Sequence, residues 1–226
     1  PWTPATFQAC MAAREKAMPG IKAWREGVVR RADNALKYDW PVPDFAPPLS
    51  SWGYMCKCKN WLQHDPPNNP RRHKCRKCGK IVEGDLRIDR EGLERYNGAR
   101  GRNVRDLALA WLITGDKKYA EKSTRMLLKY AENYPTMPYI GLRSTAGAAR
   151  LGYATLKESY ILPRFAEGYH YLEASSVLDE EKRAKVVHFL RQVGAIISRH
   201  SVEYNNQQAE HIRAYGTAGL STGFWP

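Results

Sequence analysis

Residues 106–120 read DLALAWLITGDKKYA, and this stretch decides the fold. Its apolar residues recur at helical spacing up to Ile113, and Thr114 and Gly115 then end the helix. Asp116 is a favoured N-cap for a second helix, which continues until Pro135. Two helices joined by a short turn that contains glycine predict an antiparallel helical hairpin.

Helical patterns continue on both sides of this hairpin. On the N-terminal side, Thr3-Pro4 starts a helix that runs to about residue 18, and a second one continues to about residue 38. On the C-terminal side, helices are expected at 144–162, at 165–172 after Pro163, at 180–200 and at 206–220. Alternation typical of strands is scarce outside 54–82. We therefore predict a mainly α fold built as an array of helical hairpins, such as a toroid or solenoid.

Composition changes divide the chain into three parts. Residues 1–53 hold the N-terminal helices and a proline-rich loop, residues 54–82 hold four cysteines, and residues 83–226 hold the helical hairpins. The chain opens with Pro1 rather than Met and stops at Pro226, so we expect it to be a portion of a longer protein.

The cysteines of the middle part occur in two close pairs. The first pair reads CKC at 56–58 and the second reads CRKCG at 75–79. Each close pair can bring two thiolates to one side of a tetrahedral zinc ion, so we predict a structural zinc site in a zinc-ribbon-like module. The expected ligands are Cys56, Cys58, Cys75 and Cys78. His64 or His73 could replace one of the first pair, disulfides are the competing interpretation, and Cys10 is expected on a buried helix face.

The chain is strongly basic. Its 36 Lys and Arg against 23 Asp and Glu give a formal net charge of +13, which suits a polyanionic partner. The candidates are an acidic polysaccharide, a nucleic acid or an anionic membrane surface. No apolar run approaches the roughly 18 residues of a membrane span.

Three further stretches belong with the hairpin. They read YNGAR at 96–100, LLKYAENYP at 127–135 and NNQQAEH at 205–211, the last in a helix that ends in GTAGL at 216–220. This ordered set, with the cysteine pairs before it, resembles the N-terminal α/α-toroid of heparinase II/III-like polysaccharide lyases and the related alginate lyases. The resemblance covers most of residues 50–222. It implies an incomplete (α/α) toroid of antiparallel helical hairpins into which the zinc-binding module is inserted.

The resemblance also implies a reaction. These enzymes cleave uronate-containing glycans by β-elimination, and Asn206 matches the residue that neutralises the uronate carboxylate. Gln207 stands where many relatives carry His, and glutamine cannot relay a proton. His211, one helical turn further on, is expected to face the same cleft. The resemblance further implies a periplasmic or secreted enzyme and a C-terminal β-sheet domain, absent from this chain, that supplies another catalytic residue.

Further residues are expected to bind the substrate. Helix N-termini and arginine side chains suit carboxylate or sulfate groups. The competing interpretations are helix capping for the asparagines, solvated surface charge for the arginines and plain packing within the hairpins. The predicted substrate-binding residues are Asn97, Arg100, Arg143, Arg150 and Asn205. Glu158 and Tyr169 are expected to be structural.

Two other functions remain open at this point. A basic zinc ribbon with Arg71, Arg72, Lys74, Arg76 and Lys77 could bind nucleic acid, although this leaves the helical motifs unexplained. A non-catalytic glycan-binding module built from helical hairpins is the third reading. It predicts glycan binding that survives Asn206→Ala and yields no unsaturated product.

Overall fold

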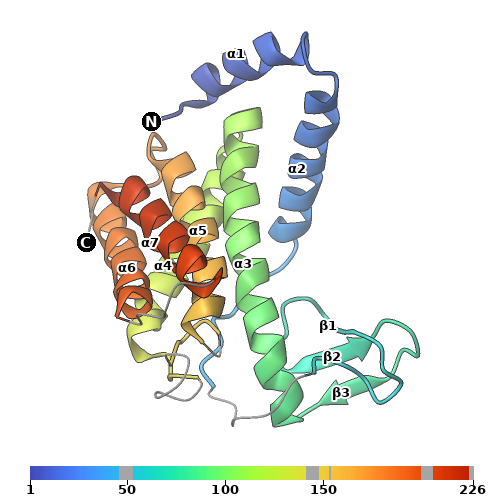
Figure 1. The fold of residues 1–226 in the computed structure, drawn as a ribbon. Helices are drawn as coiled ribbons and strands as arrows, with labels where there is room; N and C mark the ends of the chain where they lie inside the picture. Colours follow the sequence, from blue (N-terminus) through green and yellow to red (C-terminus); the bar gives the residue numbers. More distant parts are fainter. Residues whose placement is uncertain (46–52, 141–147, 153, 200–205, 224–226) are drawn as a thin grey trace.

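The computed structural model describes residues 1–45, 53–140, 148–152, 154–199 and 206–223 (Figure 1). The chain is mainly helical, as predicted, with one small antiparallel sheet in the order β1-β2-β3. The elements are α1 (Pro4–Glu15), α2 (Gly20–Leu36), β1 (Leu62–His64), β2 (Arg72–Cys75), β3 (Ile81–Glu83), α3 (Leu86–Thr114), α4 (Lys117–Asn133), a 3-10 turn (Tyr134–Thr136), α5 (Thr155–Leu172), α6 (Glu180–Ser198) and α7 (Asn206–Thr222).

The predicted hairpin is α3 followed by α4. Gly115 ends α3 with φ of +77°, a conformation that glycine adopts without steric cost, and its N–H donates to the carbonyl of Trp111 at 2.7 Å. Asp116 then caps α4 by accepting the backbone N–H of Lys118 at 3.1 Å. The residues that predicted the turn, Gly115 and Asp116, therefore form it in the structure.

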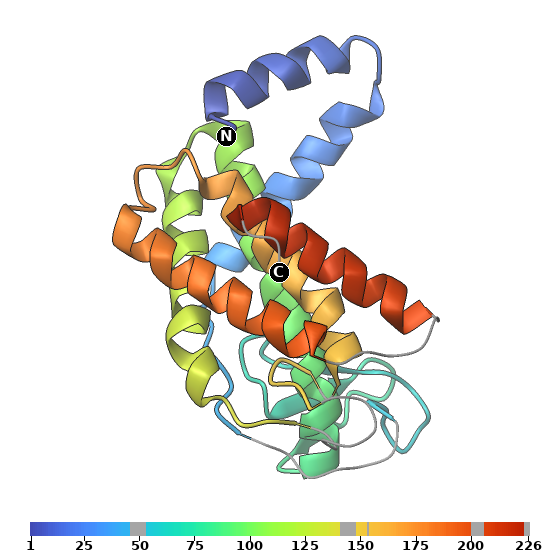
Figure 2. The ribbon, with the colours of Figure 1, turned by 60° about the vertical axis from the view of Figure 1, so that its left-hand side comes forward.

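The C-terminal helices form two layers. Helices α3, α5 and α7 lie side by side, and α4 and α6 pack against one side of that row (Figure 2). Between the layers lies an aromatic core in which Phe165 is 4.7 Å from Tyr130 and 5.5 Å from Phe189, measured between ring centres. Gly168 of α5 allows close approach to α3, because a Cβ there would lie 2.6 Å from Val104 Cγ1. Closure of these layers into a toroid remains a prediction.

The third predicted helix differs from the observed one. It was expected to start at 144 and to break at Pro163, but α5 begins at Thr155 and continues through Pro163 to Leu172. Ahead of it, Ile140 and Ala149 form an isolated antiparallel bridge instead of helical turns. Buried Leu162 and Phe165 flank the proline, so packing on both sides holds the helix together across the missing N–H donor.

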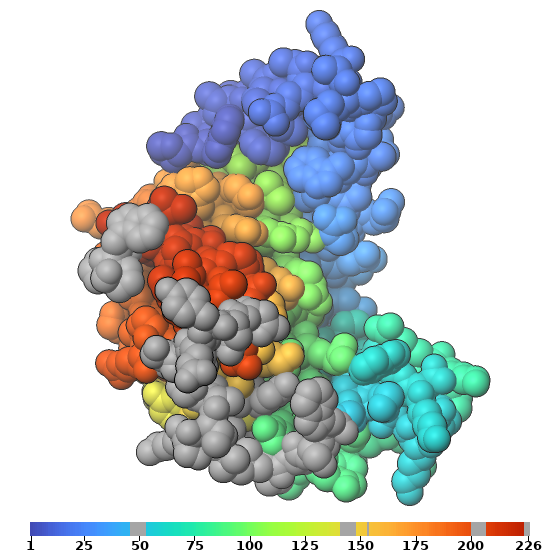
Figure 3. All heavy atoms as spheres, in the orientation of Figure 1, coloured from blue at the N-terminus to red at the C-terminus, as the bar shows by residue number. Residues whose placement is uncertain are grey.

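The cysteine-containing part folds as a separate lobe beside the N-terminal end of α3, visible in cyan in Figure 3. Its three strands pair with Leu62 opposite Cys75 and His73 opposite Val82. At the other end of α3, α1 and α2 extend the molecule, and α2 packs along α3 through Val28 and Ala32. None of the described helices combines the length and apolar character that a membrane crossing requires.

Candidate functional site

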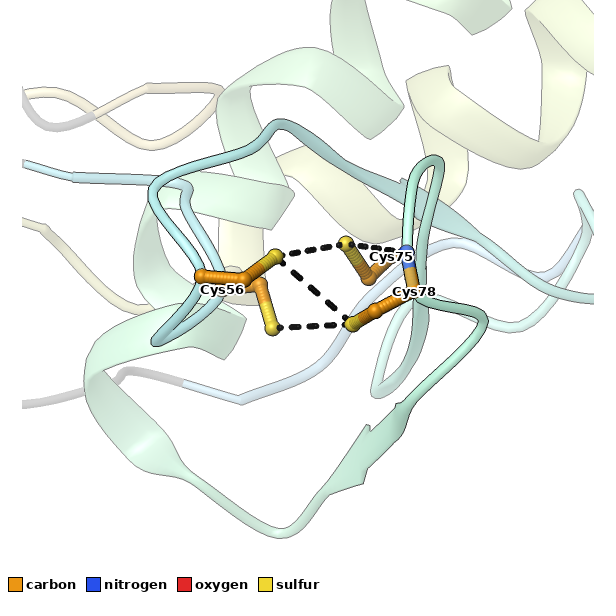
Figure 4. A group of neighbouring side chains, drawn as sticks. Cys56, Cys75 and Cys78 are labelled. Carbon is orange, nitrogen blue, oxygen red and sulfur yellow. Dashed lines mark hydrogen bonds between the residues drawn. The ribbon is translucent and has the colours of Figure 1, made fainter.

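The four predicted cysteine ligands come together in the lobe. Cys56 and Cys58 precede β1, Cys75 ends β2, and Cys78 follows in the turn to β3. The sulfur atoms lie 3.7 Å apart for Cys56 and Cys78, 3.5 Å for Cys58 and Cys75, and 3.6 Å for Cys58 and Cys78 (Figure 4). All four lie within 4.8 Å of one another. This is a set of four thiolates that a tetrahedral metal ion can join.

Backbone geometry prepares one of these thiols for a metal. The N–H groups of Lys77 and Cys78 point at the sulfur of Cys75, at 3.4 and 3.5 Å. These contacts, that of Cys78 first, lower the pKa of Cys75 to about 6. Gly79 then closes the turn with φ of +71°. The thiolate is the form that binds metal, so the turn favours a ligand.

The alternative ligands lie outside the thiol group. His73 is fully buried, with Nδ1 2.8 Å from the hydroxyl of Tyr54 and Nε2 2.8 Å from Asp89 Oδ1. Cys10 lies on α1, and all five cysteines carry free thiols. Four thiolates around one ion leave no coordination position open, which fits a structural centre.

A second histidine, His64, lies beside the hydrogen-bonded residues Tyr54, His73 and Asp89. The His64 ring centre is 5.2 Å from that of His73 and 5.4 Å from that of Tyr96. Burial, followed by electrostatic interactions with His73 and Arg100, lowers the pKa of His64 to about 3. His64 is therefore neutral at physiological pH.

A cavity of about 440 Å³ opens between the lobe, α3 and α5. Most of its charged side chains are positive, and we call it the basic groove. It is lined by Tyr54, Leu62, Gln63, His64, Arg76, Glu94, Arg95, Gly98, Ala99, Arg102, Lys157, Tyr160, Ile161 and Arg164.

Among the described residues that line the basic groove, Glu94 is the one carboxylate. Lys157 pairs with Glu94 at 3.4 Å, but in the described parts of the chain no carboxylate lies within ion-pair distance of the four lining arginines, Arg76, Arg95, Arg102 and Arg164. Burial and the charge of Arg102 both lower the pKa of Arg164. Guanidinium groups crowded in this way favour an anionic ligand, which would relieve their mutual repulsion.

Two predicted substrate-binding residues on α3 are buried and bonded inside the protein. Asn97 donates from Nδ2 to the Leu151 carbonyl at 2.8 Å and accepts the Tyr130 hydroxyl at 2.8 Å. The guanidinium of Arg100 lies 3.5 Å from the ring centre of Trp40. These contacts hold α3 to its neighbours, and a role in substrate binding remains a prediction for both.

Arg150 makes contacts of the same kind. Its guanidinium donates to the backbone carbonyls of Tyr134, at 2.6 Å, and of Pro135, and lies 4.4 Å from the ring centre of Tyr139. Its backbone N–H donates to the buried carboxyl of Glu158 at 2.7 Å. Glu158 thus has the structural contacts expected of it, while the binding role of Arg150 stays a prediction.

Three of the predicted residues, Asn206, Gln207 and His211, belong to α7. Asn205 and Arg143 fall outside the described residues, as does the side chain of Asn206, whose backbone begins the helix. His211 is buried and Gln207 is half-buried. Helix α7 packs along α5, and Arg213 lies near enough to Arg164 to lower its pKa. The second turn of α7 therefore adjoins the basic groove.

Sequence reasoning missed the groove arginines of α3 and α5, and it named Arg76 only as part of a nucleic-acid-binding ribbon. Arg95 and Arg102 are seven residues apart, so two helical turns place them on one face of α3, about 10 Å apart. That spacing is the only sequence signal for the groove, and arginines on a solvent-exposed helix face have the same spacing. The cavity forms because the lobe packs beside this face of α3, and only the three-dimensional structure shows that packing.

Comparison with known proteins gives one family. The family model described as alginate lyase matches residues 53–223, which is well over half of the chain. The match includes the cysteine lobe, the basic groove and α7. Among curated proteins, no match was found.

Proposed function

Because this chain belongs to the alginate lyase family, whose members are polysaccharide lyases, we propose that it cleaves an acidic, uronate-containing glycan bound in the basic groove. The supporting observation is the set of four groove arginines without a carboxylate partner among the described residues. A planar guanidinium binds a carboxylate through two parallel hydrogen bonds, so such a groove suits a polymer with regularly spaced carboxylates.

The proposed reaction is β-elimination. A base removes the proton at C5 of the uronate, the bond from C4 to the glycosidic oxygen breaks, a double bond forms between C4 and C5, and the leaving oxygen takes up a proton. The C5 proton is too weakly acidic while the neighbouring carboxylate keeps its full charge. We assign Asn206 to neutralise that carboxylate by hydrogen bonding, which stabilises the charge that develops in the transition state.

Proton transfer needs other side chains. Gln207 cannot relay a proton, and the groove itself offers the hydroxyl of Tyr160 as a candidate for proton transfer. His211, buried one helical turn after Gln207, keeps its proposed place beside Asn206 in the same cleft. In this proposal the catalytic amide belongs to α7, and the groove charges belong to the lobe, α3 and α5.

The metal in this proposal is zinc, held by the four cysteines. Its role is to fold the lobe, because four thiolate ligands leave no position for substrate or water. Since alginate lyases act on extracellular polymers, we place the protein in the periplasm or outside the cell.

The test is an elimination assay. The purified protein is incubated with alginate, heparan sulfate, chondroitin and hyaluronan, and the near-ultraviolet absorbance of the unsaturated product is followed. We expect activity on at least one glycan, abolished in Asn206→Ala. Arg102→Gln should lower kcat/KM about tenfold, the loss of about 1.4 kcal/mol of binding. Arg125→Gln removes the same charge from an exposed position on α4 and should have no effect.

Two outcomes would overturn this function. The first is the absence of product from every glycan by protein that is folded and carries its metal. The second is tight, salt-dependent binding of DNA or RNA by such an inactive sample, which would favour the zinc-ribbon alternative.

A further inference from the structure

One end of the basic groove is formed by the metal-binding lobe, where an aromatic ring is exposed. Trp61 lies between Cys58 and β1, and 51% of its surface is exposed. The guanidinium of Arg95, on α3, lies over the Trp61 ring at 4.8 Å from its centre and 5.3 Å from the ring centre of Tyr54. The lobe and α3 thus meet at a stacked pair that still presents much of the indole to solvent.

A second arginine joins this pair from the metal-binding turn. Arg76 lies between the ligands Cys75 and Cys78, and its backbone N–H donates to the carbonyl of Trp61 at 3.1 Å. Its side chain is exposed and lines the groove. Arg76 and Arg95 therefore line the lobe end of the groove, and Trp61 adjoins it through the ring contact with Arg95 and the backbone bond to Arg76.

We propose that Trp61, Arg76 and Arg95 form a glycan-binding subsite that holds one uronate unit at the lobe end of the groove. The apolar C–H face of a pyranose ring stacks on an exposed indole, and the two arginines pair with the carboxylate of the same unit. This inference rests on the proposed function and adds to it a site of recognition on the metal-binding lobe.

In this proposal the metal also supports substrate binding, in addition to folding the lobe. Arg76 is held between two of the ligands, and Trp61 is tied to Arg76 through the backbone. Loss of the metal would release this turn and with it two of the three subsite residues. The metal then supports substrate binding without touching substrate, while Asn206 is carried by a different element, α7.

A nucleic acid could also use arginines and an aromatic ring, through phosphates and stacked bases. The glycan is favoured because Arg76 and Arg95 line the groove of a chain from a polysaccharide lyase family. Single-stranded DNA is therefore included in the experiment as a competing ligand.

The experiment measures the affinity for an alginate hexasaccharide by calorimetry, in the Asn206→Ala background so that the ligand is not consumed. Trp61→Ala and Arg76→Gln should each raise Kd about tenfold, the weight of one charge-assisted contact or stacked ring. Trp61→Phe keeps an aromatic face and should restore most of the affinity. Metal content and melting temperature should match the parent protein in every variant.

Two control variants change residues of the same chemical type outside the subsite. Lys77→Gln changes the charge of the same metal-binding turn outside the groove lining, and Trp24→Ala removes an exposed tryptophan from α2. Both should leave Kd unchanged.

The outcomes separate the subsite from the proposed function. If the wild-type protein cleaves alginate but Trp61→Ala and Arg76→Gln bind the hexasaccharide normally, the subsite is wrong and the lyase function stands. If the wild-type protein neither cleaves nor binds any glycan, both fail. Weaker binding of single-stranded DNA by these variants, with glycan binding unaffected, would also overturn the subsite.

Discussion

His73 and Asp89 are joined by a 2.8 Å hydrogen bond, and neither side chain has any exposed surface. His73 lies on β2, two residues before the ligand Cys75, while Asp89 lies in the first turn of α3. The bond therefore ties the metal-binding lobe to the helix that lines the basic groove. The lobe's own apolar cluster is small, so this buried polar contact has a large share in orienting it.

Removal of the carboxylate should loosen the lobe. Asp89→Ala leaves His73 and Arg71, which lies 3.3 Å from Asp89 Oδ2, without their acceptor. We expect the free energy of unfolding to fall by about 3 kcal/mol, the usual effect of breaking a buried charged contact. Urea denaturation measures it. The control Glu181→Gln removes an exposed carboxylate from α6 and should change stability by less than about 0.5 kcal/mol.

Metal binding should depend on the four clustered cysteines alone. Cys78→Ser removes one ligand, so zinc content, measured by elemental analysis, should fall from about one ion per chain toward zero, and the melting temperature should fall with it. Cys10→Ser changes a cysteine on α1 outside the cluster and should retain the metal. Equal metal content in the two variants would argue against the cluster as the binding site.

Local signals predicted much of this fold. The turn at Gly115, the N-cap at Asp116 and the start of α7 at residue 206 all follow from residues close in sequence. The course of α5 did not, because Pro163 normally ends or kinks a helix and only packing against α3 and α6 overrides that preference.

The candidate site divides in the same way. The metal ligands follow from spacing, since each pair lies within one turn of chain. The basic groove does not, because it depends on the lobe lying over α3, a contact between residues distant in sequence. Asn97 is the opposite case: its residue type suits a binding site, but in the fold its amide bonds to Leu151 and Tyr130.

The close approach of α5 to α3 gives a prediction about packing. Gly168→Ala would place a methyl group 2.6 Å from Val104 Cγ1 and 3.2 Å from the backbone nitrogen of Arg105, so the helices must separate. We expect a loss of about 2 kcal/mol of stability. Gly194→Ala, in α6 with nothing within 4 Å of the new methyl group, should instead stabilise the protein by about 0.5 kcal/mol. Thermal unfolding of the two variants should therefore shift in opposite directions.

The buried carboxyl of Glu158 should make the free energy of unfolding depend on pH. Burial raises its pKa from 4.5 to about 7, although the backbone N–H of Leu151 donates to Oε1 at 2.8 Å. Its other oxygen, Oε2, is buried without a hydrogen-bond partner among the described residues, which favours the protonated form. Between about pH 4.5 and 7 the folded protein keeps this proton while the unfolded chain has lost it.

Stability should therefore fall as pH rises through this window, by about 1.4 kcal/mol per unit and roughly 3 kcal/mol in all, because the folded state binds the extra proton. His64 acts with the opposite sign: its pKa is lowered in the fold from 6.5 to about 3, so its contribution to stability is gained as pH rises from about 3 to 6.5. The difference between wild type and Glu158→Gln separates the two, because only the carboxyl is removed. In urea denaturation from pH 4 to 8, the stabilities of wild type and Glu158→Gln should be similar near pH 4 and should separate as pH rises, with wild type falling below the variant by roughly 3 kcal/mol. A constant difference between them would mean that Glu158 does not titrate in this range.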